Sequence, residues 1–255
     1  MVGLGKSPDI GVHHGLIRKF RNLGLDHEEA LRAFLGVVKV GRHTRRGEDI
    51  IGPGSSSKHL TVLLAGIACL YERLEDGSRQ IYAFQYAGDF CDLHRYVLKL
   101  DDARVVGALA GCFTGIIQHK DLDRTIEQYP KLGLALWRAS MLEASIFAER
   151  LLNLGRRAAL QRVAHLLCEQ LARREMIGIT SAVIPLAQTD LADAAELSTV
   201  HINRVLQDFR RLGVLSQMGR TIKVLNAERL VDIAKFDSRY LNMPVALSGW
   251  EIHVD

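Results

Sequence analysis

The residues best suited to recognising a ligand lie between Gln188 and Leu215, in QTDLADAAELSTVHINRVLQDFRRLGVL. This stretch fits a short helix over 190–195, a turn at 196–197 and a second helix over 199–211. Ser198 stands where an N-cap residue accepts backbone N–H bonds. One face of the second helix is apolar, which predicts burial of Ile202, Val205, Leu206 and Phe209. The opposite face carries mainly polar side chains: Thr199, His201, Asn203, Arg204, Gln207 and Arg211. Such a helix fits the major groove of DNA, where its N-terminal residues meet base edges.

Arg204 lies one turn into the second helix, where a guanidinium can bind guanine O6 and N7 through two hydrogen bonds. The alternative for Arg204 is a solvated surface arginine, and His201 contacts either a phosphate or nothing. No acidic residue precedes Asp208 on this face, as a surface that approaches phosphates requires. The following LSQMGRTIKVL predicts a hairpin wing around Met218–Gly219, with Arg220 contacting phosphate only. We expect DNA contacts from Gln188, Thr189, Ser198, Thr199, Val200, His201, Asn203, Arg204 and Arg220.

A long helix is expected upstream, over 129–153, from apolar residues at helical spacing. One stripe has the alternating four- and three-residue steps of a coiled-coil seam: Trp137, Met141, Ala144, Ala148 and Leu151. A second stripe lies on another face: Ala135, Ala139, Leu142 and Ile146. Two stripes predict two partners, a β domain on one side and a second subunit on the other. The alternative is a helix buried within one monomer. Gly155 is expected to mark the end of the helix.

Between residues 37 and 120 the texture is that of short strands. Apolar runs rich in Val, Ile, Tyr and Phe alternate with turn residues, and Asp76-Gly77 predicts a hairpin turn. Many short strands at close spacing favour a compact barrel or roll. We therefore expect an α+β fold with an N-terminal cupin-like β-roll, a long dimerisation helix and a C-terminal winged helix-turn-helix. The expected boundaries are a lead-in over 1–36 with one helix near 26–35, a β-roll over 37–128, the dimerisation helix over 129–155, the winged helix-turn-helix over 156–241 and a tail over 242–255.

Composition is that of an ordinary globular protein able to bury a proper core. The 255 residues are 48% hydrophobic and 24% charged, with a net charge of +4. Residues 156–241 hold 13 Lys/Arg against 9 Asp/Glu, whereas residues 1–155 hold 20 against 18. The C-terminal part is the more basic, which permits an anionic partner there.

Other classes of protein find little support in the sequence. The 4 cysteines form no CxxC pair, which argues against a zinc ribbon and a disulfide framework and suits a reducing cytoplasm. The N-terminus lacks the apolar stretch of a secretory signal, and LTVLLAGIACLY is too short to span a bilayer. We expect a cytoplasmic protein with no membrane partner and no metal site.

An enzyme is not expected either, because no catalytic constellation stands out. GPGSSS, at 52–57, lacks both the lysine of a P-loop and the framing glycine of a nucleophile elbow. The pair His13-His14 is expected to have no role. We therefore assign no catalytic residues.

The order of β-roll, long helix and winged helix-turn-helix resembles the CRP/FNR family of bacterial transcription regulators, over about residues 35–240. The landmarks are Gly66 within LLAGIACLY, the GDF at 88–90, the helix end at Asn153-Leu154 and the 188–215 stretch itself. The resemblance implies a roll of the cyclic-nucleotide-binding type and a homodimer joined along the long helix. It also implies double-stranded DNA with a two-fold symmetric site, effector or partner-protein input through the roll, and RNA polymerase as a protein partner.

The effector residues of the family are where this sequence departs from it. Cyclic-AMP-binding members carry an arginine-serine pair for the phosphate, and that position aligns with Asp102-Ala103 here. The threonine-serine pair that meets the purine in those members aligns with Phe147-Ala148. A carboxylate repels a cyclic phosphate, so we do not expect dependence on cyclic AMP. A shift of two residues would bring Arg104 into the phosphate role, which is the alternative.

The positions of the Cys and His residues indicate whether this chain can bind the cofactors used by two other branches of the family. No cysteine precedes Cys69, which argues against the N-terminal iron–sulfur cluster of the oxygen-sensing branch. Cys91 and His94 lie close to the haem ligands of the carbon-monoxide-sensing branch, at a different spacing. The alternative for this pair is a buried structural cysteine and a hydrogen-bonded histidine. We expect no cofactor, with haem or an unknown small effector as the alternative, and the candidate effector pocket comprises Asp89, Cys91, His94 and Phe147.

The recognition helix departs from the family at one position. Family members usually carry an acidic residue two positions after the N-cap, which accepts a hydrogen bond from cytosine, and Val200 stands there. Half of the usual half-site code is therefore expected to differ. The rival to a DNA-reading regulator is a ligand- or haem-sensing module in which the roll binds an unidentified effector.

Overall fold

The computed structural model describes residues 13–55, 58–100 and 104–242. The chain divides into two compact units. The first unit comprises 1–68 and 85–140, and the second comprises 69–84 and 141–255. Both units contain helices and strands, so the expected α+β class is confirmed.

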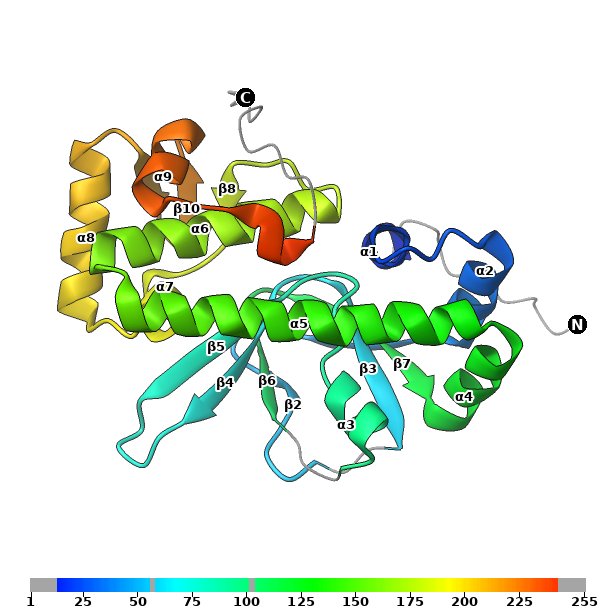
Figure 1. The fold of residues 1–255 in the computed structure, drawn as a ribbon. Coiled ribbons are helices and arrows are strands. Elements are labelled where there is room, and N and C mark those ends of the chain that lie inside the picture. The colour runs from blue at the N-terminus through cyan, green and yellow to red at the C-terminus, as the bar shows by residue number, and fades with distance from the viewer. Residues whose placement is uncertain (1–12, 56–57, 101–103, 243–255) are drawn as a thin grey trace, which may run out of the picture. The chain divides into compact units, whose positions relative to one another are not determined.

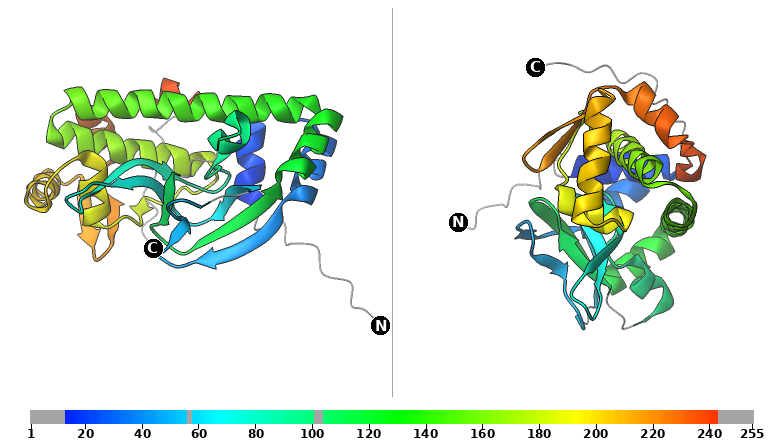
Figure 2. Two further views of the ribbon diagram at one scale, coloured as in Figure 1. Left: turned by 90° about the horizontal axis from the view of Figure 1, so that it is seen from below. Right: turned by 90° about the vertical axis from the view of Figure 1, so that its left-hand side faces the viewer.

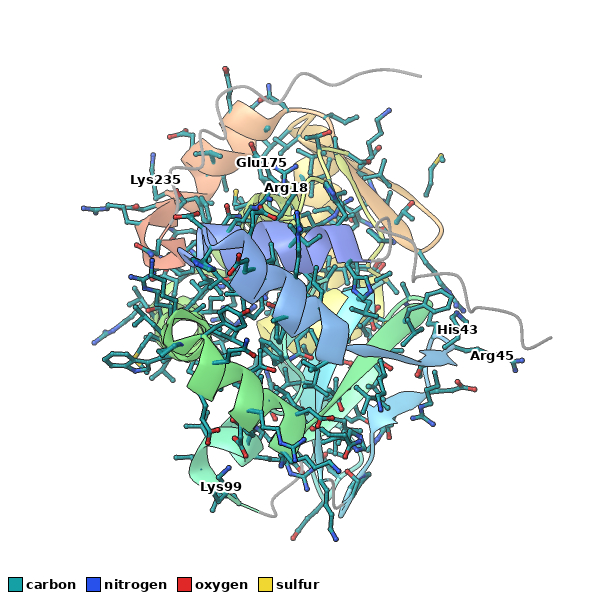
Figure 3. All side chains as sticks on the ribbon, turned by 90° about the vertical axis from the view of Figure 1, so that its right-hand side faces the viewer. Arg18, His43, Arg45, Lys99, Glu175 and Lys235 are labelled. Carbon is teal, nitrogen blue, oxygen red and sulfur yellow. The ribbon has the colours of Figure 1, made fainter. Side chains whose placement is uncertain are left out.

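The first unit is built on two sets of antiparallel strands. One sheet has the order β1-β7-β3, formed by β1 (Lys39–Thr44), β7 (Cys112–Gln118) and β3 (His59–Ala65). The other set pairs β2 (Asp49–Ile51) with β6 (Val105–Ala108). Five successive residues of β3 are buried, from Leu60 to Leu64, so this strand is covered on both faces. Most of β1 is exposed instead: the ring of His43 lies 4.7 Å from that of Phe113, and Arg45, the residue after the strand, points away from the molecule (Figure 3).

Gly66, a family landmark, is required by the backbone at the end of β3. Its φ is +97°, in the left-handed region that favours glycine. A Cβ built on it would lie 2.3 Å from the carbonyl oxygen of Gly111 and 2.9 Å from the Sγ of Cys112. Any side chain here would push the strands apart.

Two helices precede the strands, so the expectation of a single helix in the lead-in is wrong. The expected helix is α2 (Glu28–Val37), two residues later than predicted, and α1 (His14–Asn22) comes before it. Leu16 and Phe20 of α1 are fully buried, and the ring of Phe20 lies 4.6 Å from that of Phe34 in α2 and 5.9 Å from that of Phe90. The lead-in from residue 14 onward therefore contributes to the core of the first unit. The remaining helices of this unit are α3 (Leu93–Leu98) and α4 (His119–Gln128).

The long helix is α5 (Pro130–Arg156), which runs without interruption (Figure 1). The helix predicted over 129–153 is confirmed and continues three residues further. Gly155 lies in its last turn and does not have a positive φ, so the prediction that it marks the helix end is wrong. The boundary between the two units falls inside this helix, between Ser140 and Met141.

The second unit contains a strand pair, a helical domain and a small sheet. The strand pair is β4 (Ala68–Arg73) and β5 (Arg79–Gln85), joined by a turn in which Gly77 has φ +82°, as Asp76-Gly77 predicted. The helices are α6 (Ala159–Met176), α7 (Gln188–Ala195), α8 (Thr199–Arg211) and α9 (Ala227–Ala234), followed by the 3-10 helix η2 (Ser238–Leu241). The small sheet has the order β8-β10-β9, formed by β8 (Val183–Ile184), β10 (Thr221–Val224) and β9 (Leu215–Met218). Within the described residues, no helix is both long enough and apolar enough to cross a membrane.

Candidate nucleic-acid interface

The helix pair predicted from the sequence is α7 and α8. Helix α7 begins at Gln188, two residues earlier than expected, and the side chain of Asp190 accepts a hydrogen bond from the backbone N–H of Ala187 at 3.1 Å. Glu196 ends it in the left-handed conformation, with φ 51°. The Oγ of Ser198 then accepts the backbone N–H of His201 at 3.2 Å, which confirms Ser198 as the N-cap of α8.

Helix α8 has the two faces that its sequence predicts. The buried face consists of Ile202, Val205, Leu206 and Phe209. The predicted polar residues are exposed on the other face, together with Val200: Thr199, Val200, His201, Asn203, Arg204, Gln207 and Arg211. Because the apolar face is anchored in the unit, the polar face is held rigidly toward solvent. This is the arrangement that a helix needs in order to enter a groove of DNA.

Charge on this face is almost entirely positive. Asp208 is the one acidic residue of α8, and its carboxylate pairs with the guanidinium of Arg211 at 2.6 Å. The guanidinium of Arg204 makes no hydrogen bond or ion pair within the described part of the chain, so it remains available to a ligand. The amide nitrogen of Asn203 donates to the carbonyl of Thr199 at 3.0 Å, which leaves its oxygen as the outward acceptor.

The predicted wing is the hairpin β9–β10, which follows α8 directly in the sequence. Helix α8 and this hairpin lie side by side in both views (Figure 2). Its turn is Gly219–Arg220, one residue later than predicted, with Arg220 exposed at the tip. Arg210, which the sequence reading did not assign, donates to the side-chain oxygen of Gln217 at 2.8 Å and so joins α8 to β9. A polar contact between a helix and the strand after it has no periodic signal in the sequence.

Arg79 of β5 holds α7 from outside the helical domain. Its Nε lies 2.8 Å from the carboxylate of Asp193 and its Nη2 lies 2.9 Å from that of Asp190. The guanidinium also lies 5.6 Å from the centre of the Tyr71 ring in β4. The partners are more than a hundred residues apart in the chain, so sequence reasoning had no signal for this contact. It fixes the helix that precedes the recognition helix.

The turn between α5 and α6 is held by a second arginine. Arg162 donates from one nitrogen to the carbonyl of Ala195 at the end of α7, and from another to the carbonyl of Leu154 in α5, both at 2.9 Å. The side chain of Asn153 donates to the carbonyl of Arg162 at 3.2 Å. The end of the long helix, the start of α6 and the end of α7 are therefore tied at one point.

The predicted seam of α5 is uncovered in the single chain. Trp137 is 64% exposed, Met141 52% and Leu151 75%, and Ala144 and Ala148 are exposed as well. The second stripe is buried within the chain: Ala135, Ala139, Leu142 and Ile146. Burial of both stripes within one monomer is thus wrong, because a row of large apolar side chains remains in contact with solvent.

The candidate effector residues are divided between the two units. Asp89, Cys91 and His94 lie in the first unit, whereas Phe147 lies in the second, with its ring 6.1 Å from that of Tyr82. The carboxylate of Asp89 pairs with Lys19 of α1 and accepts the backbone N–H of Tyr86 at 2.7 Å. Lys19 comes from the helix that the sequence reading missed. Asp102 and Ala103 lie outside the described residues.

Among the described residues, no group of three or more His, Cys, Asp or Glu side chains lies close enough together to hold a metal ion. Cys91 is buried, and its backbone N–H donates to the carbonyl of Thr61 at 2.8 Å. Next to it, Asp92 is also buried and accepts the backbone N–H of Thr61 at 2.7 Å. Burial raises the pKa of Asp92 to about 6 despite that hydrogen bond. His13 is buried too, and burial lowers its pKa.

Known proteins resemble this chain along most of its length. Residues 161–233, from α6 into α9, match the Crp-like helix-turn-helix domain. The transcriptional activatory protein AadR of Rhodopseudomonas palustris is 30% identical over 220 residues, which cover 82% of this chain and 85% of that protein. The chain belongs to the CRP/FNR family of transcription regulators. Another member, the transcriptional activator protein FnrL of Cereibacter sphaeroides, is 28% identical over 84% of this chain and 87% of its own length.

Solved structures share the fold of this CRP/FNR regulator. FixK2 from Bradyrhizobium japonicum superposes with a TM-score of 0.64 at 23% identity, covering 77% of this chain and 97% of that one. The resemblance drawn from the order of roll, long helix and helix-turn-helix is therefore confirmed. In this chain α7 and α8 are the helix-turn-helix of the family.

Proposed function

We propose that this CRP/FNR regulator is a homodimer that reads a palindromic DNA site through α8 and does not depend on a cyclic nucleotide. The observation that carries the proposal is the recognition helix itself. Its N-terminus is capped by Ser198, its apolar face is buried and its polar face is exposed with an uncommitted Arg204. A rigid helix with a polar, acid-poor outer face is suited to a groove lined by phosphates.

Individual contacts follow from the chemistry of each side chain. Arg204 reads guanine through two hydrogen bonds, and Val200, 60% exposed, packs against a thymine methyl because it can accept no hydrogen bond. Arg220 at the tip of the wing contacts phosphate. The remaining contacts to bases or backbone come from the N-terminal parts of the two helices: Gln188, Thr189, Ser198, Thr199, His201 and Asn203.

The dimer is supported by the exposed seam of α5. Residues at this spacing on two copies of one helix interdigitate about a two-fold axis, and such an interface is self-complementary. A two-fold protein requires a two-fold DNA site, with half-sites about one helical turn, roughly 34–36 Å, apart. RNA polymerase is the protein partner we assign, since AadR and FnrL bear the names of transcriptional activators.

Independence from cyclic nucleotides is supported by two positions. Phe147 stands where the resemblance places a purine-binding hydroxyl, and an aromatic ring offers no hydrogen bond there. Asp89, a residue of the candidate effector pocket, pairs with Lys19 of α1. We therefore assign control to the abundance of the dimer or to an effector of another kind.

The test is selection of bound duplexes from a random DNA library by the purified protein, with no nucleotide added. We expect an enriched palindrome with a guanine in each half. Enrichment of a single, non-repeated element, or none at all, would contradict the proposal.

A further inference from the structure

The last described part of the chain packs against α6. The ring of Tyr240 in η2 stacks on that of His165 in α6, with centres 6.0 Å apart and planes 20° apart. The ring of Phe236 lies 5.0 Å from the same imidazole. His165 is 1% exposed, so two aromatic rings from the C-terminal segment help to seal it from water.

The hydroxyl of Tyr240 binds a buried cluster of charged side chains that includes Glu169 and Arg150. It donates to Oε2 of Glu169 at 2.9 Å, and Oε1 of the same carboxylate lies 3.4 Å from Nη2 of Arg150 and 4.0 Å from Nη1 of Arg173. Glu169 is 2% exposed and Arg150 is 4% exposed. A carboxylate so far from water is costly unless each oxygen keeps a partner. Tyr240 supplies the partner of one oxygen.

This cluster joins three elements that are distant in the sequence. Arg150 lies on α5, next to the seam residue Leu151, while Glu169 and His165 lie on α6, and Tyr240 lies on η2. A second contact runs parallel to it, because Glu149 of α5 lies 3.1 Å from Nε2 of His165. The covalent link between α5 and α6 is a short turn held by Arg162, and these side chains join the two helices further from the turn.

We propose that Tyr240 is a positioning residue for DNA reading, which acts through Glu169 and Arg150 to set the angle between the long helix and the helix-turn-helix. The proposal rests on the proposed function, because the angle matters only if two copies joined along α5 read two half-sites together. In that dimer, a change of the angle between α5 and α6 in each subunit changes the distance between the two copies of α8. Tyr240 would then determine which half-site spacing is accepted, without touching DNA.

Tyr240→Phe is the test, since it removes the hydroxyl and keeps the ring on His165. The affinities of wild-type and variant protein are measured for one half-site, for the palindrome and for palindromes lengthened or shortened by one base pair. We expect the affinity for the half-site to change by less than about twofold, and that for the palindrome to fall by about tenfold, the effect of one lost hydrogen bond to a charged group. Discrimination among spacings should weaken. Tyr129→Phe in the first unit, whose hydroxyl accepts a hydrogen bond from the side chain of Gln128, is the matched control and should behave as wild type.

Two outcomes would overturn the proposal. One is a Tyr240→Phe protein with unchanged affinity and unchanged spacing preference, and the other is an equal loss on half-site and palindrome. A wild-type protein that does not prefer the palindrome over the half-site would instead overturn the proposed function. These failures are distinguishable because the first two leave the wild-type preference intact.

A distance measurement covers the case in which DNA binding by the variant is too weak to compare. A spin label on Glu228→Cys, at an exposed position of α9, reports the separation of the two DNA-binding regions in the dimer, and the native cysteines are all buried. The distance distribution should be narrow in the protein that keeps Tyr240 and clearly broader in the Tyr240→Phe variant. Identical distributions would show that the hydroxyl does not set the angle.

Discussion

At the scale of single residues, the side chain of Arg204 is the one that we propose to read a base. Neighbouring Arg211 is engaged by Asp208 and Arg210 by Gln217, whereas Arg204 has no partner within the described residues. The planar guanidinium presents its N–H donors in a fixed fork that matches the O6 and N7 acceptors of guanine, so we propose that Arg204 discriminates between bases.

Arg204→Ala should therefore relax the preference for guanine at one position in each half-site. The expected loss is about 1–3 kcal/mol per half-site, with the other positions unchanged. Binding-site selection with the variant measures this directly. Arg211→Ala removes the same charge from the same helix and should leave base preference intact. Full sequence preference in the Arg204→Ala protein would show that another residue reads the base.

Val200→Glu should create the base contact that the family usually makes. A carboxylate at this exposed position can accept a hydrogen bond from the cytosine amino group, which valine cannot. In the wild type we expect no base preference, or a preference for thymine, at the corresponding position. In the variant we expect a preference for cytosine there. Competition between the two duplexes measures the shift, and an unchanged ranking would mean that residue 200 does not face the bases.

His165 carries a pH dependence of stability. Burial, together with the nearby Arg157 and Arg150, lowers the pKa of His165 to about 3, and the carboxylate of Glu149 does not compensate. The unfolded chain takes up a proton at this residue below about pH 6.5, while the folded chain does so only near pH 3. The free energy of unfolding should thus fall as the pH drops from 6.5 toward 3, with a slope approaching about 1.4 kcal/mol per pH unit for this one proton.

His165→Gln should reduce that slope relative to the wild type. Urea unfolding of both proteins at pH 7 and pH 5 measures it, and the comparison cancels other titrating groups such as Asp92. Asp92 acts in the opposite direction, because its raised pKa means that the folded state binds its proton first as the pH falls through 6. If the free energy of unfolding changes with pH equally in both proteins, the pH dependence comes from a residue other than His165.

At the scale of elements, α5 is a helix with two apolar stripes, of which the chain covers one. Ala139, Leu142 and Ile146 are buried, and Trp137 and Met141 face solvent. Leaving large apolar side chains in water along a continuous row is unfavourable, at about 25 cal/mol for each Å² of apolar surface. A second α5 that packs along the row would remove this cost.

Met141→Asp should give a monomer that no longer binds the palindrome tightly. Packing the seam would bring the two introduced carboxylates, one from each subunit, together away from water, which opposes association. Sedimentation at micromolar concentration measures the state of the protein. Leu98→Asp is the control, because Leu98 is similarly exposed but lies on α3, and this variant should stay dimeric. A wild-type protein that sediments as a monomer would contradict the assignment of the seam.

At the scale of the whole molecule, we propose that this regulator does not respond to cyclic nucleotides. Calorimetric titration with cyclic AMP and cyclic GMP should show no binding at physiological concentrations. The physical reason is the loss of the phosphate- and purine-binding groups that the family resemblance places at Asp102-Ala103 and Phe147-Ala148. A micromolar dissociation constant for either nucleotide would contradict this.

A purified protein without a Soret band after haem reconstitution would exclude the haem alternative for Cys91 and His94.

Sequence patterns alone predicted the cap and both faces of α8 and the fold class. The N-cap at Ser198, the two faces of α8 and the length of α5 to within a few residues follow from local rules. Helical periodicity and capping depend on neighbours three or four positions away, so they are legible in the sequence. The two stripes of α5 were also legible: the stripe with coiled-coil spacing was predicted to face a second subunit, and it is the one that the chain leaves exposed.

Tertiary structure alone decided the contacts between distant segments. Arg79 with Asp190, Tyr240 with Glu169 and Lys19 with Asp89 join residues 111, 71 and 70 positions apart, and none of these pairs has a periodic signal. Helix α1 was missed although its buried residues Leu16 and Phe20 lie four positions apart, on one helical face; the sequence did not show that Phe34 and Phe90 cover this face. Local rules describe an element by its own neighbours, whereas the angle and anchoring of each element depend on charges and rings that only the folded chain brings within a few ångströms of one another.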